Sequence, residues 1–229
     1  MMITPTHIVL VGLGREGLSS YHFFAKQYPD ASWILTDDRQ LDALEEHWQQ
    51  IVANGAQYVP LAGLADWSAN SANNSALLLV KTAGIPLENA GVRACLDRGA
   101  TLTSNTAAFF ATLPTLPVKP RTIGITGTKG KSTTSSMIYH CLRENDVPVV
   151  LAGNIGVPPL ETLQDPILMT ATADNPPVVF LELSSHQLRE LTISPEIAVI
   201  QDITPEHLDY YASFDEYLAA KAPITQFQT

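Results

Sequence analysis

The sequence contains little cysteine, few basic residues and no long apolar run. Its two cysteines, Cys95 and Cys141, are isolated in apolar helical contexts, so we expect two buried thiols rather than a disulfide or a metal pair. The 13 basic residues against 23 acidic ones leave a formal charge of −10, which argues against nucleic acid as a partner. No run can span a bilayer and the first residues lack a signal-peptide pattern, so we expect a cytoplasmic protein without a membrane partner.

The most informative stretch is 122–137, TIGITGTKGKSTTSSM. A strand, a glycine loop and a helix in this order bind phosphate, because the loop N–H groups and the helix dipole face the anion. We therefore predict an NTP site in which Lys131 reaches the outer phosphates and Ser132 reaches Mg²⁺. The loop is shorter than G-x-x-x-x-G-K-[ST], and an ordinary glycine turn is the alternative. The candidate phosphate-binding residues are Gly127, Thr128, Lys129, Gly130, Lys131, Ser132 and Thr133.

A second glycine turn lies near the N-terminus. The apolar run 7–11 leads into G-L-G-R-E-G at 12–17, and a strand expected at 33–36 ends at Asp37. An acid at the tip of the second strand, placed for a ribose hydroxyl, is typical of a βαβ nucleotide site. Two alternatives stay open: the glycines serve only helix–strand packing, and Asp37 is a solvated carboxylate.

Strands and helices alternate along the chain, which predicts an α/β fold with parallel sheets. Three prolines in 113–121 predict a semi-rigid connector. The predicted domains are 1–118, Rossmann-like with a parallel sheet, and 119–229, the first part of a P-loop ATPase-like α/β central domain. Among the local predictions are a helix at 41–54, surface loops at 63–75 and 165–175, and a helix at 213–228 that Ser213 caps and Pro223 kinks or ends.

Glu182 interrupts the apolar run 177–183. A carboxylate in a buried strand is costly unless something pairs with it. Mg²⁺ beside the phosphate loop would provide that partner. A helix-capping or hydrogen-bonded core glutamate is the alternative.

Five motifs in order resemble the Mur ligases, the ATP-dependent amide ligases of peptidoglycan precursor synthesis. They are G-T-K-G-K-S, G-N-I-G, E-L-S-S-H-Q-L, T-P-E-H-L-D and the alanine-flanked Lys221. The G-L-G-x-x-G turn is most similar to members that add D-glutamate to UDP-N-acetylmuramoyl-L-alanine. The resemblance implies a monomeric ligase of cell wall biogenesis, connected with cell division and cell shape. In such a ligase ATP forms an acyl phosphate on the UDP-sugar substrate, and D-glutamate then attacks it.

The resemblance also implies roles for single residues. Lys131, Glu182, His207 and Lys221 would be catalytic, and two Mg²⁺ would be held by Ser132, Glu182, His207 and Lys221, the last as a lysine carbamylated with CO₂. The alternatives are a satisfied strand-end histidine for His207, a solvated helix lysine for Lys221 and a turn residue with positive φ for Asn154. The implied substrate-binding residues are Gly14, Arg15, Glu16, Asp37, Arg39, Thr82, Gly84, Asn154 and His207.

The sequence departs from the family in three respects. Ser104-Asn105-Thr106 lies where relatives often carry an acidic or differently patterned loop. Arg15 and Glu16 place charges where the similar ligases have neutral side chains. The family continues into a domain that binds the incoming amino acid, so we expect this chain to be a fragment that is inactive alone. Three alternatives remain: another amide ligase of a different Mur step or of folate or cyanophycin type, an NAD-dependent oxidoreductase or NAD-binding module, and a UDP-sugar-binding module.

Overall fold

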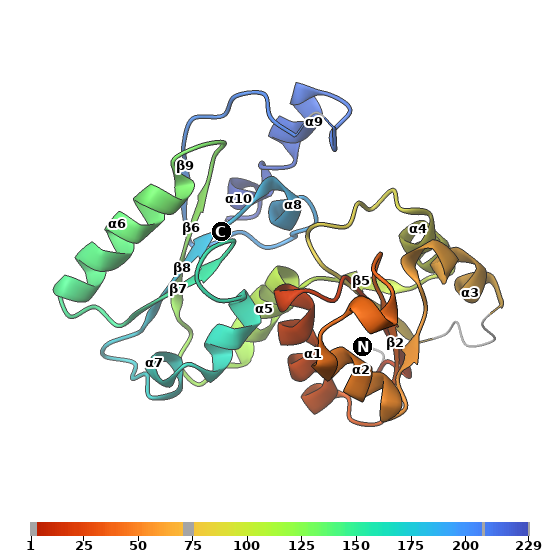
Figure 1. Ribbon diagram of the computed structural model, residues 1–229. Coiled ribbons are helices and arrows are strands. Elements are labelled where there is room, and N and C mark those ends of the chain that lie inside the picture. Colours follow the sequence, from red (N-terminus) through yellow and green to blue (C-terminus); the bar gives the residue numbers. More distant parts are fainter. Residues whose placement is uncertain (1–3, 71–75, 208, 229) are drawn as a thin grey trace. The chain divides into compact units, whose positions relative to one another are not determined.

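The computed structural model describes residues 4–70, 76–207 and 209–228. By their internal contacts they form two compact units, 1–105 and 106–229, each with its own parallel sheet (Figure 1). The predicted α/β fold with parallel sheets is confirmed. The predicted domain limit at 118/119 lies beyond this division and stays a prediction.

The first unit has a five-stranded parallel sheet in the order β3-β2-β1-β4-β5. Because β1 pairs with β2 on one side and β4 on the other, the chain reverses its direction of travel across the sheet between β1 and β4. Open α/β sheets bind ligands at the carboxyl ends of strands beside such a reversal. The elements are β1 (His7–Val11), α1 (Arg15–Gln27), β2 (Ser32–Thr36), η1 (Leu41–Ala43), α2 (Glu46–Ala53), β3 (Gln57–Tyr58), η2 (Leu61–Gly63), α3 (Leu64–Asn70), β4 (Leu77–Lys81), α4 (Ala90–Asp97) and β5 (Thr101–Thr103).

Both faces of this first sheet are covered. Side chains alternate along a strand, so Val9 and Leu79 share one face and pack with Val92 of α4. On the opposite face, the ring of Trp33 lies 4.6 Å from that of Tyr21 of α1, measured between centroids. The Tyr21 ring in turn lies 5.9 Å from Trp48 of α2. Because helices cover both faces of this sheet, its strands are apolar along their length and do not alternate between apolar and polar residues.

The second unit has a four-stranded parallel sheet in the order β7-β8-β6-β9, with β6 in the interior. Ile125 of β6 and Phe180 of β8 pack with Ile138 and Leu142 of α6, so α6 covers one face. The elements are β6 (Arg121–Thr126), α6 (Lys131–Glu144), β7 (Val149–Gly153), η4 (Pro159–Gln164), α7 (Pro166–Met169), β8 (Val178–Glu182), α8 (Ser185–Leu188), β9 (Ile197–Ile200), α9 (Phe214–Ala219) and α10 (Pro223–Gln226). Before them come α5 (Asn105–Thr112), which begins at the division between the units, and η3 (Leu113–Thr115).

Several local predictions were wrong. The predicted helix at 41–54 is interrupted, because Leu44 and Glu45 adopt extended backbone between η1 and α2. The predicted loop at 63–75 contains α3, while its residues 71–75 lie outside the described residues. The predicted loop at 165–175 contains the short helix α7. Cys95 is buried as predicted, but Cys141 is exposed, because Ile138 and Leu142 occupy the buried side of α6.

The C-terminal helix prediction was correct in its start and its break. The Ser213 hydroxyl accepts a hydrogen bond from the Glu216 N–H at 3.1 Å and caps α9. The helix then ends at Ala219, and α10 begins at Pro223, where a proline fits the first turn.

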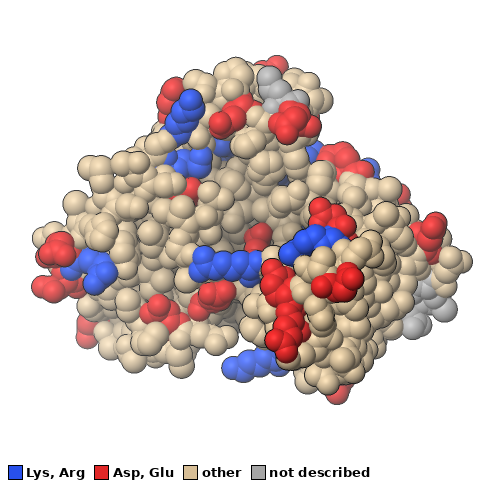
Figure 2. Space-filling view, in the orientation of Figure 1, with Lys and Arg blue, Asp and Glu red and all other residues tan. Residues whose placement is uncertain are grey.

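Charge is distributed rather than concentrated on the face that Figure 2 shows. Acidic and basic side chains of the described residues are interspersed there among uncharged ones. None of the helices in the described part of the chain is both long and apolar enough to cross a membrane.

Candidate nucleotide sites

The phosphate loop follows β6 and is anchored to the segment after β9. The Thr128 N–H donates to the Asp202 carbonyl at 2.9 Å, and the Thr128 hydroxyl accepts from the Thr204 N–H at 3.0 Å. A Cβ on Gly127 would lie 2.8 Å from Cβ of Gln201, so the close approach requires glycine here. Gly130, at φ +80°, is the N-cap of α6 and supplies no side-chain cap. The helix N-terminus therefore stays open toward an anion.

Two lysines meet at one carbonyl oxygen of this loop. Lys131 Nζ donates to the carbonyls of Gly127 and Thr128, both at 2.9 Å. Lys221 Nζ donates to the same Gly127 carbonyl at 3.1 Å and lies 4.5 Å from the centroid of the Tyr217 ring. Lys221 is 3% exposed, so a solvated helix lysine is the wrong interpretation. Burial, followed by the nearby charge of Lys131, lowers the pKa of Lys221 to about 8.

Glu182 ends β8, beside Ile125 of β6 and Gly153 of β7. It is fully buried, and its Oε1 accepts a hydrogen bond from Asn154 Nδ2 at 2.9 Å. Its other carboxylate oxygen, Oε2, is buried without a hydrogen-bond partner. Buried polar atoms are rarely left in this state, and a cation would satisfy this one. The alternative of a hydrogen-bonded core glutamate accounts for Oε1 and leaves Oε2 unexplained, so the metal role stays a prediction.

Asn154 is not the turn residue with positive φ that we considered as an alternative. The left-handed positions of this turn are Gly153, at φ +104°, and Gly156, at φ +75°. Asn154 instead directs its amide to Glu182.

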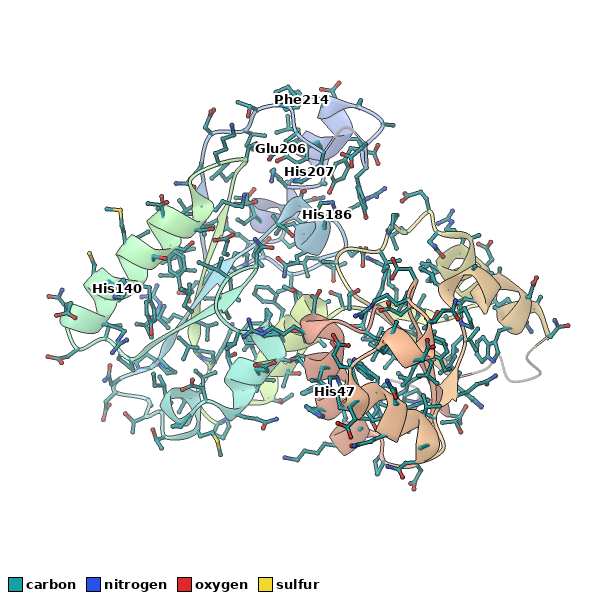
Figure 3. All side chains as sticks on the ribbon, viewed as in Figure 1. His47, His140, His186, Glu206, His207 and Phe214 are labelled. Atoms are coloured by element: carbon teal, nitrogen blue, oxygen red, sulfur yellow. The ribbon has the colours of Figure 1, made fainter. Side chains whose placement is uncertain are left out.

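His207 has a left-handed backbone, at φ +56°, which is uncommon outside glycine. Its carbonyl accepts hydrogen bonds from the N–H groups of Tyr210 at 3.0 Å and Tyr211 at 2.9 Å. Its ring centroid lies 5.2 Å from that of His186 and 6.1 Å from that of Tyr217. Figure 3 shows His186, Glu206, His207 and Phe214 gathered in one region of the second unit, with His140 apart on α6.

Tyr217 connects these groups, and sequence reasoning did not identify it. Its hydroxyl lies 3.1 Å from the Thr128 hydroxyl of the phosphate loop, and its ring contacts both Lys221 and His207. The signal was its position four residues before Lys221 in the predicted helix 213–228, a spacing that would place the two side chains on one helical face.

The described residues hold no cluster of three or more His, Cys, Asp and Glu side chains that could bind a metal ion alone.

The three glycines of the N-terminal turn differ in their surroundings. A Cβ on Gly12 would lie 2.0 Å from Oγ1 of Thr82, and one on Gly17 would lie 2.1 Å from the Gly12 carbonyl oxygen. These two glycines serve packing, as the alternative proposed. A Cβ on Gly14 would meet nothing within 4 Å, and Gly14 caps α1 without a side chain. Only Gly14 leaves room for a ligand to approach the helix N-terminus.

Asp37 closes the turn from the end of β2. Its Oδ2 accepts from the Leu13 N–H at 2.6 Å, and its Oδ1 accepts from Arg39 Nε at 2.9 Å. Burial alone would raise the pKa of Asp37, but the hydrogen bonds from the Arg39 side chain and the Leu13 backbone outweigh it and lower the pKa to about 2. Asp37 is 5% exposed, so a solvated carboxylate is the wrong interpretation.

The comparison with known proteins decides the family. Residues 125–229 match the Mur ligase middle domain. UDP-N-acetylmuramoyl-L-alanine–L-glutamate ligase of Micromonospora sp. is 36% identical over 214 residues, which cover 93% of this chain and 42% of that protein. UDP-N-acetylmuramoylalanine–D-glutamate ligase of Streptococcus agalactiae is 38% identical over 219 residues, which cover 93% of this chain and 44% of that protein. The chain belongs to the Mur ligase family.

This Mur ligase chain thus spans less than half the length of those two relatives. Among solved structures, a UDP-N-acetylmuramate:L-alanyl-gamma-D-glutamyl-meso-diaminopimelate ligase from Neisseria meningitides matches 98% of this chain and 69% of its own, with a TM-score of 0.50 and 16% identity. At that identity the match supports the fold alone.

The Mur ligase chain brings the predicted residues together in two groups. In the first unit, hydrogen bonds connect the G-L-G-R-E-G turn with Asp37, Arg39 and the loop after β4. In the second unit, Lys131 and Lys221 meet at the phosphate loop, and Glu182 meets Asn154. Ser132 and Thr133 are exposed on the first turn of α6. The roles of all these residues stay predictions. This includes the implied binding of the substrate by Asn154 and His207.

Proposed function

We propose that this chain forms the nucleotide-binding part of an ATP-dependent ligase that joins glutamate to UDP-N-acetylmuramoyl-L-alanine in peptidoglycan synthesis. The observation that carries the proposal is the phosphate loop of the second unit. There Lys131 and Lys221 meet at the Gly127 carbonyl, and Glu182 ends the neighbouring strand with one buried oxygen that lacks a partner. The names of the two relatives support the reaction and the substrates.

The residues of the second unit fit ATP with Mg²⁺. The open N-terminus of α6 and the Lys131 ammonium bind the phosphates, and the Ser132 hydroxyl lies on the first turn beside them. Glu182 Oε2 and the His207 imidazole are the groups that would hold the two Mg²⁺, together with Lys221 once CO₂ has converted its amine to a carbamate. Mg²⁺ bound there neutralises charge between the phosphate and the substrate carboxylate.

The first unit is the proposed site for the uridine diphosphate. Asp37 is held by Leu13 and Arg39 at the end of β2, where a ribose hydroxyl is bound in βαβ sites. Gly14 leaves the N-terminus of α1 accessible, and the loop containing Thr82 and Gly84 follows β4 at the same sheet edge. We propose that the amino acid is D-glutamate. Because one relative is named an L-glutamate ligase, an assay must compare both enantiomers.

The test of the ATP site uses two lysines of the second unit. Lys131 binds the loop carbonyls, whereas Lys119 is exposed in the segment before β6 and lies outside the phosphate loop. We expect Lys131→Met to weaken MgATP binding by about tenfold or more, because it removes a charge-assisted contact to phosphate. Lys119→Met is the control and should bind within about threefold of the wild type. Calorimetric titration of the 229-residue chain measures both. Equal affinity for the two variants, or no ATP binding by the wild type, would contradict the proposal.

A further inference from the structure

One peptide group in the first unit is held at both ends by side chains of opposite charge. Glu16 Oε2 accepts a hydrogen bond from the Ala83 N–H at 3.0 Å. Lys81 Nζ donates to the Thr82 carbonyl oxygen at 3.1 Å. That N–H and that carbonyl belong to the single peptide between Thr82 and Ala83. An anion at the N–H end and a cation at the carbonyl end both favour one orientation of its dipole.

The same peptide begins a turn that is fixed on one side and open on the other. The Ile85 N–H donates to the Thr82 carbonyl at 3.3 Å, and Lys81 Nζ also donates to the Ile85 carbonyl at 2.8 Å. The Thr82 hydroxyl donates to the Val11 carbonyl at 3.0 Å, which ties the turn to the end of β1. In contrast, Gly84 is exposed, and a Cβ placed on it would meet nothing within 4 Å. The turn therefore has an open side at the carboxyl edge of the sheet.

We propose that Glu16 and Lys81 are positioning residues for nucleotide binding. They hold the 82–83 peptide, and through it the turn 82–85, in the orientation that receives the uridine nucleotide. The inference rests on the proposed function of the first unit. Because the turn is ordered before the nucleotide binds, binding carries no free-energy cost for ordering it. The affinity is higher by that free energy. The Glu16 carboxylate acts through Ala83, which accounts for a negative charge beside a site proposed for a diphosphate.

If Lys81 served only to stabilise the fold, its replacement would lower the thermal stability of the chain. Its side chain is 1% exposed, and an ammonium at such a position is costly to desolvate. Methionine in its place removes that desolvation cost together with two hydrogen bonds to carbonyl oxygens, so the two effects on stability oppose each other. Lys81→Met should therefore leave thermal stability close to that of the wild type while it weakens nucleotide binding.

The experiment titrates the 229-residue chain with UDP and with uridine. We expect Lys81→Met to weaken both ligands by about tenfold, because a charge-assisted hydrogen bond that orders the turn is lost. Glu16→Gln, which keeps the shape and loses the charge, should weaken uridine by about threefold. Lys26→Met, at an exposed lysine of α1, is the control and should change neither affinity. In the double variant the loss should be smaller than the product of the two single losses, because both residues hold one peptide.

Each outcome of these titrations either supports or contradicts the positioning role. If Lys81→Met weakens UDP but not uridine, Lys81 acts as a charge for the phosphates, and the positioning role is wrong. If both single variants bind uridine as the wild type does, the proposal also fails, while UDP binding by the wild type would leave the proposed function intact. If the wild type binds neither ligand, the proposed function of this unit fails and the inference fails with it. If Lys81→Met does not fold, Glu16→Gln carries the test, together with faster amide hydrogen exchange at Ala83.

Discussion

Asn154 binds Glu182 twice, through its side-chain amide to Oε1 at 2.9 Å and through its backbone N–H to the Glu182 carbonyl at 2.8 Å. The two contacts fix the carboxylate, so the direction of the unpartnered Oε2 is also fixed. A metal ligand needs this kind of support, because an unsupported carboxylate must be ordered when the ion binds. The G-N-I-G motif thus has a physical role beside the glutamate of the next strand.

Glu182→Gln is predicted to remove the effect of Mg²⁺ without unfolding the chain. The glutamine Oε1 can still accept from Asn154, so stability without metal should change by about 1 kcal/mol or less. A ligand that binds only the folded state raises its melting temperature. With ATP present, Mg²⁺ should therefore raise the melting temperature of the wild type but not of Glu182→Gln. Glu161→Gln, at an exposed residue of η4, should respond as the wild type does. An equal response of Glu182→Gln would exclude it as a ligand.

Lys221 is predicted to react with CO₂ at mildly alkaline pH. Its pKa in the folded chain is about 8, against 10.5 for an ordinary lysine, so about half of the amine is neutral at pH 8. ¹³C-bicarbonate should then give a carbamate signal by NMR that is absent from Lys221→Met and present in Lys129→Met. The lowered pKa also means that the unfolded chain binds the proton more tightly between pH 8 and 10.5. The contribution of Lys221 to stability should rise with pH across that window. A carbamate signal that persists in Lys221→Met would refute the assignment.

The strands and the two glycine turns could be predicted because their signals are local. Apolar runs such as 7–11 and 178–181 end at glycine or at a charged residue. The bounds of β1 and β8 agree closely with these runs. The helix α3 was missed because its stretch is polar overall. Only Leu64 and Ser68, one turn apart, are buried there, and Leu64 packs against Gly91 of α4.

The site contacts that were missed join residues far apart in sequence. Nothing near Lys81 indicates that Glu16 holds the other end of the same peptide, because the pairing of β1 with β4 brings them together. Likewise, Tyr217 reaches Thr128 only after the chain has passed β9 and returned in α9. Motifs identify residues with chemical potential, whereas the contacts that orient them depend on the topology of the sheet.

Asp37 is predicted to stabilise the first unit above pH 4 and to lose that contribution in acid. Its pKa falls from 3.8 in the unfolded chain to about 2 in the folded one, so the contribution is complete above 3.8 and is lost as the pH falls toward 2. A shift of this size corresponds to about 2 kcal/mol. Urea unfolding followed by tryptophan fluorescence reports this unit, since Trp33, Trp48 and Trp67 all lie in it. Asp37→Asn should lose stability at pH 6 and show a flatter dependence between pH 4 and 2. An unchanged slope would show that Arg39 and Leu13 do not hold the ionised form.

Gly14 and Gly17 are predicted to respond in opposite ways to alanine. In Gly17→Ala the new Cβ would lie 2.1 Å from the Gly12 carbonyl oxygen, so α1 must move away from β1. We expect a loss of about 2–4 kcal/mol in the unfolding free energy of the first unit, measured by tryptophan fluorescence in urea. Gly14→Ala meets no atom within 4 Å and should cost about 1 kcal/mol or less.

The same pair separates packing from binding. Because the Gly14 methyl group would project at the open N-terminus of α1, Gly14→Ala should weaken UDP binding by about tenfold while the fold is kept. UDP titration and urea unfolding of the two variants test both statements together. If Gly17→Ala is as stable as Gly14→Ala, the glycine does not serve helix–strand packing. If Gly14→Ala binds UDP as tightly as the wild type, the ligand does not approach the helix here, and the nucleotide must be bound by the turns after β2 and β4 alone.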